Sequence, residues 1–365
     1  AINERTKRIM AYTTINKSTL HCNQTLYTGN ATTRTISGVN FQPGLAWLKD
    51  YDTVPPPVPA VFDSIRGATY SLNPGGTTAN TQQLQELTAF NADGFDLGTS
   101  SIVNGNTVPN IAWCFKGGSS NVSNANGSIT STVSADPTAG FSVVKYTGTG
   151  ANATVGHGLS SAPEFILIKN FTSTSTQWSA YHVGIGPTKY FWFSDNPAAA
   201  TSSAYWNNTA PTTAAADAGV FSLGSATEVN GSSDEHIAYC FSPVRGFSAA
   251  GIYNGNGNLD GPFIYTGFKP AMVVIKVVEY YGSWNLFDTK RAGYNVDNYL
   301  INWGAAAVQN STGPDLLDLV SNGFKIREDG SQGFNNASRT YCYYAWAEAP
   351  FVATSGTTAV PVTAR

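Results

Sequence analysis

The chain has 365 residues, of which 12% are charged and 12% aromatic, and its formal net charge is −3 at pH 7. This charge gives no electrostatic reason to expect nucleic-acid binding, and the many aromatic residues argue against intrinsic disorder. No apolar stretch reaches the length of a transmembrane helix, and the first residues lack the apolar segment of a signal peptide. We therefore expect neither membrane insertion nor classical secretion.

Residues 1–19 are interpreted as an N-terminal arm. Its basic cluster, "ERTKR", contains Arg5, Lys7 and Arg8. Such termini are often simply solvated, and they can also dock on a neighbouring subunit. These three residues are therefore our candidates for contacts that hold an assembly together.

A seven-residue phrase then occurs three times, as "PGLAWLK" at 43–49, "PEFILIK" at 163–169 and "PAMVVIK" at 270–276. Proline can begin a strand because no backbone donor is needed there. A continuous apolar run is typical of a strand that is covered on both faces. We expect a neighbouring module or subunit to supply the second cover, and the final lysine to mark where the strand returns to water.

The phrase belongs to a longer repeat. A tyrosine turn precedes it ("YTGN", "YTGTG", "YNGNG"), and an aromatic closing strand follows it ("IAWCF", "IAYCF", "YYAWA"). Matches in the same order at near-equal spacing indicate a threefold tandem repeat. The predicted modules are 20–117, 140–243 and 244–351, with a Gly/Ser/Asn-rich linker over 118–139 and a C-terminal tail over 352–365.

The pattern of each unit predicts short strands separated by turns rich in Gly, Asn, Ser and Thr. The predicted fold class is therefore all-β, with three tandem antiparallel β-sandwich or jelly-roll-like modules and very little helix. A helical turn or two is expected only within "NTQQLQEL" (80–87) and "PDLLDL" (314–319).

Two cysteines occupy the same place in two copies of the closing strand. These are Cys114 in "IAWCF" and Cys240 in "IAYCF". A cysteine in such a strand usually behaves as a small buried hydrophobe. We predict free thiols, which fits assembly inside a reducing cell.

Motifs for catalysis or metal binding are missing from the sequence. No histidine has metal-ligand spacing with another His or Cys, and neither a Walker loop, a GxSxG elbow nor HExxH occurs. "GNGNLDG" (255–261) resembles a nucleotide loop, but it occupies the tyrosine-turn position of a β-repeat and is interpreted as a turn. "DEH" (234–236) and "REDG" (327–330) are interpreted as solvated turns, with weak calcium binding as the alternative. We therefore predict no enzymatic activity, no cofactor and no metal.

Charged residues near the repeated phrase could converge. Lys49 is followed by Asp63 and Arg66, and Lys276 by Asp288 and Arg291. Structural ion pairs are the favoured interpretation. A polar ligand site is the alternative, which the second module weakens because His182 stands where the aspartate is expected.

Aromatic residues among polar turn residues are the candidate binding residues. They are Tyr205 and Trp206 in "AYWNN", and Tyr280 and Tyr281 in "EYYGSW". Their rings could stack on sugars, anchor a protein interface, or pack back onto their own module.

The repeat series resembles an uncharacterised family of repeated β-modules in virion-associated proteins of marine tailed bacteriophages. The likeness is carried by "AYTTINKST", "LYTGN", "ITSTVSADPTAGFSVVKYTGTG", "SAPEFILIKN", "WNNTAPT", "DGPFIYTGFKPAMVVIK" and "GFKIR". The segment "AINERTKRI" before Met10 departs from the family's pattern and is interpreted as an added docking arm.

The resemblance implies a tail-fibre, appendage or host-attachment role on the virion exterior, with capsid decoration as the alternative. It transfers no catalytic residues. The expected partners are further copies of the chain, other virion proteins and a host-surface glycan, and a homotrimer is the predicted oligomer because phage fibres and decorations are often trimeric. Assembly would take place in the host cytoplasm. A secreted glycan-binding lectin remains a further alternative.

Overall fold

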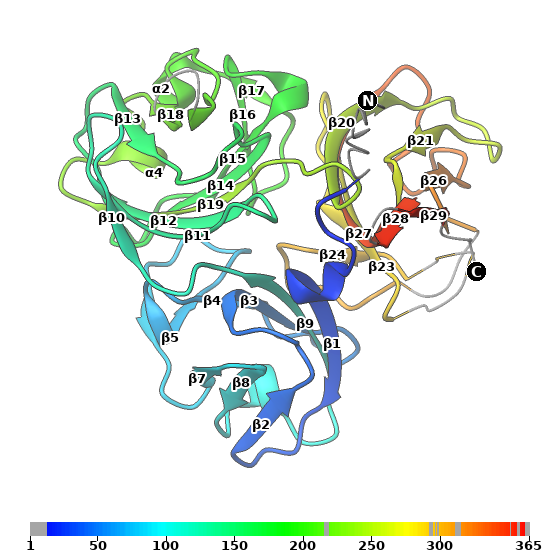
Figure 1. The fold of residues 1–365 in the computed structure, drawn as a ribbon, viewed down its shortest axis with the longest axis horizontal. Helices are drawn as coiled ribbons and strands as arrows, with labels where there is room; N and C mark the ends of the chain where they lie inside the picture. Colours follow the sequence, from blue (N-terminus) through cyan, green and yellow to red (C-terminus); the bar gives the residue numbers. More distant parts are fainter. Residues whose placement is uncertain are drawn as a thin grey trace, which may run out of the picture.

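The structure is a computed structural model that describes residues 13–214, 219–291, 295, 297, 299–310, 315–350, 352–355 and 358–361. Figure 1 shows three β-modules grouped around a common centre, in blue to cyan, green, and yellow to orange along the chain. The prediction of an all-β chain with three tandem antiparallel modules and very little helix is confirmed. No helix in the described part of the chain is both long and apolar enough to cross a membrane.

Module 1 has a six-stranded sheet in the order β1-β9-β3-β4-β5-β6 and a three-stranded sheet in the order β2-β8-β7. Its elements are η1 (Ser18–Leu20), β1 (Cys22–Thr28), β2 (Arg34–Ser37), β3 (Pro43–Asp50), β4 (Ala60–Asp63), β5 (Gly67–Leu72), β6 (Thr81–Gln82), β7 (Leu87–Asn91), β8 (Gly94–Leu97), α1 (Ser101–Asn104) and β9 (Pro109–Lys116).

Module 2 has an eight-stranded sheet in the order β10-β11-β12-β19-β14-β15-β16-β17 and a two-stranded sheet of β13 and β18. Its elements are β10 (Val122–Asn124), β11 (Ser131–Asp136), β12 (Phe141–Thr147), β13 (Ala153–Gly156), β14 (Phe165–Asn170), β15 (Ser179–His182), η2 (Val183–Ile185), β16 (Lys189–Trp192), β17 (Ala200–Thr201), α2 (Ser203–Trp206), β18 (Val220–Leu223), α4 (Thr227–Asn230) and β19 (Glu235–Phe241).

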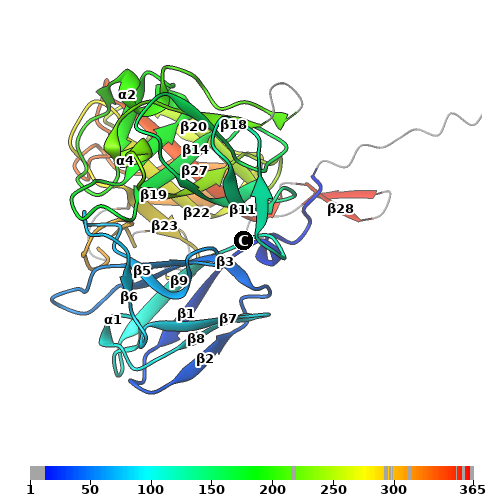
Figure 2. The same ribbon diagram turned by 90° about the vertical axis from the view of Figure 1, so that its left-hand side faces the viewer.

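Module 3 has a five-stranded sheet in the order β20-β27-β22-β23-β24 and a three-stranded sheet in the order β21-β26-β25. Its strands are β20 (Ser248–Asn254), β21 (Phe263–Tyr265), β22 (Phe268–Val277), β23 (Asn285–Asp288), β24 (Ile301–Asn302), β25 (Leu317–Val320), β26 (Gly323–Ile326) and β27 (Thr340–Pro350). A hairpin of β28 (Val352–Ser355) and β29 (Thr358–Pro361) follows and projects from the side of the body in Figure 2.

The repeated phrase lies on equivalent strands in the three modules. β3, β14 and β22 each pair on one side with the closing strand, which is β9, β19 or β27. On the other side they pair with β4, β15 and β23. The smaller sheets match as well, because Ile36 faces Phe95, Val155 faces Phe221 and Ile264 faces Phe324.

The tyrosine of each turn is repeated for a local reason. The hydroxyls of Tyr27, Tyr146 and Tyr253 donate to the carbonyl oxygens of Val103, Val229 and Phe334 at 2.6–2.7 Å. The next residue in each case is a buried asparagine whose amide donates to loop carbonyls. These bonds satisfy backbone groups that would otherwise be unpaired in the interior, so the loops are fixed in the same way in every module.

Side chains along the phrase strands alternate between two cores. In β3, Leu45 and Trp47 face a central core that all three modules share, whereas Ala46 and Leu48 face the core of module 1. In the central core Trp47 stacks on Trp303 of module 3, with ring centroids 4.6 Å apart, and packs against Trp178 of module 2. Neighbouring modules therefore supply the second cover that the continuous apolar runs predicted.

The segment 118–139 is not a free linker, which corrects the sequence-based assignment. It contains β10 and β11, and β11 pairs with β12 in the large sheet of module 2. Ile129 and Val133 are buried in the core of that module. Its Gly, Ser and Asn content suggested flexibility, but the alternating residues after Gly127 give a strand with one apolar face.

The two segments expected to form helical turns do not form them in their described residues. Residues 80–87 contain β6 and the start of β7, and β25 begins at Leu317. Single helical turns occur instead after β8 and β18, as α1 and α4. The Ser100 hydroxyl accepts from the amide of Ile102 at the start of α1, which is the usual function of an N-cap.

Candidate functional site

The lysine at the end of each phrase is fully buried, so the prediction that it returns to water is wrong. Each Nζ donates to backbone carbonyls of another module. Lys49 reaches Ala305 of module 3 at 2.6 Å, and Lys169 reaches Thr77 of module 1 at 2.9 Å. Lys276 reaches Asn196 and Pro197 of module 2 at 3.0 and 2.9 Å. The three contacts form a closed cycle, from module 1 to 3, from 3 to 2 and from 2 to 1.

Burial disfavours the charge on these amines. Desolvation lowers the pKa of Lys49 and Lys276 to about 7 and that of Lys169 to about 8. The nearby Arg291 guanidinium lowers the pKa of Lys49 further. Carbonyl oxygens rather than carboxylates accept from all three, so the lysines act as links between modules.

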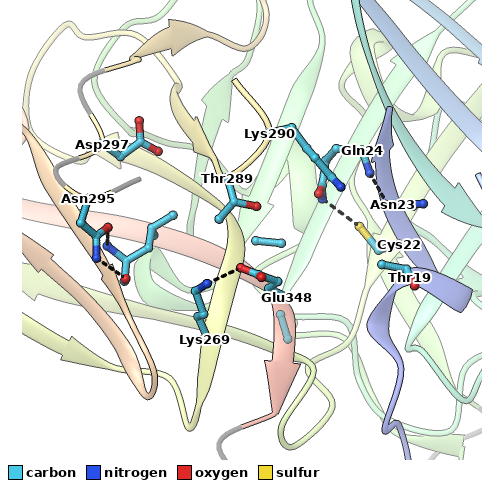
Figure 3. A pocket seen from close by; sticks show the side chains of 13 residues that line it. Thr19, Cys22, Asn23, Gln24, Lys269, Thr289, Lys290, Asn295, Asp297 and Glu348 are labelled. Carbon is cyan, nitrogen blue, oxygen red and sulfur yellow. Dashed lines mark hydrogen bonds and ion pairs between the residues drawn. The ribbon is translucent and has the colours of Figure 1, made fainter. Parts of the chain in front are cut away.

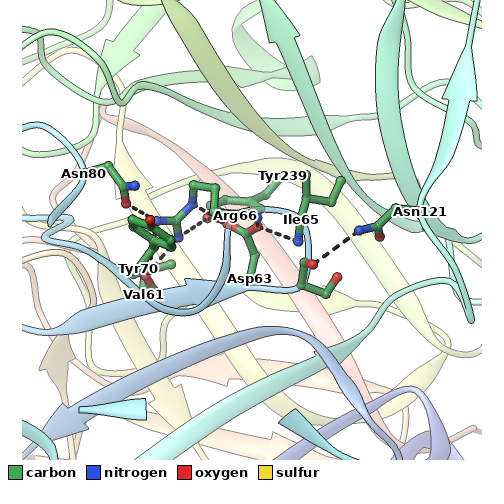
Figure 4. Close-up of polar contacts among 9 residues, drawn as sticks. Val61, Asp63, Ile65, Arg66, Tyr70, Asn80, Asn121 and Tyr239 are labelled. Carbon is green, nitrogen blue, oxygen red and sulfur yellow. Dashed lines mark hydrogen bonds and ion pairs between the residues drawn. The ribbon is translucent and has the colours of Figure 1, made fainter. Parts of the chain in front are cut away.

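A second set of polar contacts joins modules 1 and 2 (Figure 4). Asp63 Oδ2 accepts from Arg66 Nε at 2.6 Å and from the Tyr239 hydroxyl at 2.8 Å. Arg66 also donates to Asn80 at 2.7 Å. The ion pair between Asp63 and Arg66 is fully buried, and the guanidinium nitrogens of Arg66 all have acceptors. The interpretation of these two residues as a structural ion pair therefore holds. Lys49 does not join them, because it contacts Ala305.

The equivalent positions of the other modules are also structural. Asp288 and Arg291 form a buried pair at 2.7 Å in module 3. In module 2 His182 takes the place of the aspartate, facing Phe165 as Asp63 faces Leu45. The His182 ring lies 2.9 Å from the carbonyl oxygen of Tyr343 in module 3, and desolvation lowers its pKa to about 4. The substitution therefore preserves a contact between modules.

A cavity of about 590 Å³ lies between modules 1 and 3 and is lined by both polar and apolar groups. Figure 3 shows the side chains that line it. Lys269 and Glu348 form an ion pair in its wall at 2.7 Å. Asp297 is buried, and its Oδ2 has no hydrogen-bond partner among the described residues. Desolvation and then Asp288 raise the pKa of Asp297 to about 7. The cavity is large enough for a small polar molecule. Its lining residues are Thr19, Cys22, Asn23, Gln24, Lys269, Ala271, Thr289, Lys290, Asn295, Asp297, Leu319, Ala347 and Glu348.

Tyr205 and Trp206 are buried, so of the three alternatives they pack back onto their own module and are not available for binding. They lie in the single helical turn α2, which directs both rings inward. The Tyr205 ring stacks on Tyr190, with centroids 3.5 Å apart, and its hydroxyl accepts from Trp192 at 2.9 Å. These residues support module 2 from within and do not form a surface site.

Tyr280 and Tyr281 are exposed, at 55% and 72%. They lie in the loop after β22, and the Arg339 guanidinium sits 3.8 Å from the centroid of the Tyr280 ring. This cation–π contact orders Tyr280 and leaves Tyr281 as the more open ring. The other candidates, Arg5, Lys7 and Arg8, lie outside the described residues.

The acidic turns are held by hydrogen bonds within the protein, from backbone amides to Glu328 and from a side-chain amide to Asp234. Glu328 is buried and accepts from the amides of Gly330, Gln332 and Phe334. Asp234 accepts from the Asn170 amide at 2.8 Å. The turn at 255–261 leads into β21, not into a helix. Within the described ranges no group of three or more His, Cys, Asp or Glu is placed to hold a metal ion.

The sequence analysis did not single out Phe263 and Tyr265, which are 48% and 58% exposed on β21. A signal for them exists in the repeat. The equivalent strands read "TIS" (35–37) in module 1 and "TVG" (154–156) in module 2, whereas module 3 reads "FIY". Aromatic residues replace small ones at the two outward positions.

Residues 17–350 match the protein family described as "Domain of unknown function (DUF7483)". The chain belongs to this family. The match spans all three modules, in agreement with their shared core. No curated protein matches the chain.

Proposed function

We propose that this DUF7483 protein is a non-enzymatic structural protein on the exterior of a tailed-bacteriophage virion, in a tail-fibre, appendage or host-attachment role. The supporting observation is the closed cycle of lysine contacts around a shared aromatic core. Such a body resists separation of its modules because every module is held by both others. This suits a part that must keep its shape outside the cell, and the resemblance to virion-associated proteins indicates where it would serve.

The test is immunogold labelling of virions from a phage that encodes the protein, with antibodies raised against the purified chain. Label on the tail or its appendages supports the proposal. Label on the head would favour capsid decoration instead. Purified virions that carry neither label nor the chain by mass spectrometry would overturn both roles.

Glycan binding is a second candidate, supported by the exposed rings of Tyr280 and Tyr281. Exposed aromatic faces can stack on the apolar faces of sugar rings. A glycan array should then lose its signal with Tyr281→Ala. Val54→Ala is the matched control, because Val54 is 78% exposed in the equivalent loop after β3. Equal binding by both variants and the native chain would exclude this site.

A further inference from the structure

β21 is an edge strand of the outer sheet of module 3, at the periphery of the molecule in Figure 1. The amide of Ile326 donates to the carbonyl of Pro262, and that of Thr266 donates to Asn322. In an antiparallel ladder the opposed residue pairs alternate between hydrogen-bonded and non-hydrogen-bonded pairs. Ile264 and Phe324 form a hydrogen-bonded pair. The backbone N–H and C=O groups of Phe263 and Tyr265 therefore point away from β26. No described strand lies across that edge.

The equivalent edge of module 2 is covered by the chain itself. Gly127 and Ile129 form bridges with Val155 of β13. The amide of Thr154 donates to the Ser128 hydroxyl at 2.9 Å, and the Ile129 amide donates to the Thr154 carbonyl at 3.0 Å. Thr154 is the counterpart of Phe263, because both precede the residue that faces the core phenylalanine. In module 2 the outward N–H of Thr154 therefore has a side-chain partner, the Ser128 hydroxyl, and its outward C=O has a backbone partner, the Ile129 amide.

The equivalent edge of module 1 is polar. β2 carries Arg34, and the Thr35 hydroxyl donates to Asp96 at 2.7 Å within the module. Charged side chains on edge strands discourage pairing with another chain. β21 has no such protection, since its three residues are Phe, Ile and Tyr.

The charges near β21 are already neutralised within module 3. Lys325 pairs with Asp260 at 2.7 Å, and Arg327 pairs with Asp318 at 2.6 Å. A ligand at this edge therefore meets unpaired backbone groups and two aromatic rings, with no unbalanced charge on the adjoining strand β26. Those features suit an extended, uncharged peptide better than an ionic ligand.

We propose that the open edge of β21 is a docking site for an extended, uncharged peptide segment of a partner protein, which adds as a further strand beside Phe263 and Tyr265. On the equivalent strand of module 2 an uncharged segment of the chain, 127–129, covers the edge through isolated bridges, with one backbone–backbone hydrogen bond and one bond to the Ser128 hydroxyl. Backbone bonds would supply the register, and the two rings would pack on alternate side chains. This inference is independent of where the protein resides.

The probe is a synthetic peptide with the sequence "NANGSITST", which is residues 124–132 of this chain. It is titrated into the full-length protein while the backbone amide resonances of residues 263–265 are followed by NMR. We expect saturable shifts at these amides with a millimolar dissociation constant, because the peptide no longer benefits from being tethered to its edge.

Two substitutions at one position separate backbone from ring contributions. Tyr265→Ala removes the ring, and Tyr265→Pro removes the ring together with the outward N–H, which an edge strand tolerates. Tyr265→Pro should bind about tenfold more weakly than Tyr265→Ala, the value of one hydrogen bond of ~1.4 kcal/mol. Ser37→Pro, at the equivalent position of β2, is the control and should bind like the native chain. Near-UV circular dichroism checks that all three variants are folded.

The absence of any shift at the highest soluble peptide concentration would overturn the proposal. So would equal peptide binding by Tyr265→Pro and Tyr265→Ala. If soluble oligosaccharides shift these amides, and both variants lose that response equally, the surface is a sugar-stacking platform and peptide docking is wrong.

Discussion

The hydroxyl of Tyr239 in module 2 donates to the carboxylate of Asp63 in module 1 at 2.8 Å, in a site where both side chains are fully buried. Tyr239→Phe leaves the packing in place and removes the bond to Asp63 together with a longer one, at 3.4 Å, that the hydroxyl accepts from Arg66 Nη2. We expect it to lower the free energy of unfolding by about 1.5–3 kcal/mol, measured by urea denaturation. Tyr281→Phe, on an exposed ring, should change it by less than about 0.5 kcal/mol. Equal effects of the two substitutions would contradict the claim that the hydrogen bond to Asp63 stabilises the folded chain.

The lysine links differ in their number of acceptors. Lys276 Nζ donates to three carbonyl oxygens, those of Asn196, Pro197 and Gly282, whereas Lys49 Nζ donates to that of Ala305. Lys276→Met should therefore destabilise by about 1–3 kcal/mol. Lys49→Met should cost less, because relief of the buried charge offsets the loss of one bond. Thermal and urea unfolding of both variants measure this order, and the reverse order would refute the account.

The buried lysines also predict a pH dependence. Their pKa values in the folded chain are about 7 to 8, below the ordinary value of 10.5. At a pH between these values the unfolded chain therefore binds more protons than the folded chain. Stability should therefore rise with pH above about 7, by at most about 1.4 kcal/mol per pH unit for each lysine. Ionisation of exposed thiols in the unfolded chain opposes this above about pH 8.5. The free energy of unfolding is therefore measured from pH 7 to 8.5 for the native chain and for Lys276→Met. We expect it to rise more steeply with pH in the native chain, and identical slopes would contradict a contribution from Lys276.

Cys114 and Cys240 are buried free thiols at equivalent positions, facing Ala46 and Ile166, as the sequence predicted. Burial raises the pKa of both thiols, so little reactive thiolate forms. Thiol reagents should modify them only after denaturation. Cys114→Ser should destabilise by ~1–3 kcal/mol, because a hydroxyl enters an apolar site, and Cys114→Ala is the control for lost volume. A disulfide found under non-reducing conditions would refute the assignment.

The basic arm and the expected homotrimer are tested together. Light scattering should report a trimer for the native chain and a smaller species when Arg5, Lys7 and Arg8 are all changed to Gln. The same charges should matter less at high salt, which screens exposed ion pairs. A monomer at high concentration that is unaffected by the substitutions, and is still incorporated into virions, would exclude an assembly role for the arm.

The repeat could be read from the sequence because each module must build the same two-sheet core. The positions of Cys114 and Cys240, the phrase strands and the tyrosine turns all follow from local patterns that recur. The burial of the lysines could not be read in this way. Lys49 looks like the end of a strand, and the carbonyl that covers it belongs to Ala305, 256 residues away.

Tyr205 and Trp206 show the same limit at short range. "AYWNN" has the composition of a surface turn, but one turn of helix suffices to direct both rings inward. The contacts of Tyr280 with Arg339 likewise depend on a loop that follows much later in the chain. Composition indicates which residues can bind, and the packing of distant loops decides which are exposed.

The cycle of lysine contacts also has a consequence for synthesis on the ribosome. Lys49 and its acceptor Ala305 are separated by 256 residues. At a translation rate of roughly 5–20 residues per second, Ala305 is therefore synthesised about 13–50 s after Lys49. During that interval the inner face of β3, with Trp47, has no module 3 to cover it. Nascent chains on neighbouring ribosomes would expose the same aromatic face. Slow translation of the third module would therefore favour aggregation between nascent chains, and chaperones that bind aromatic surfaces would raise the yield.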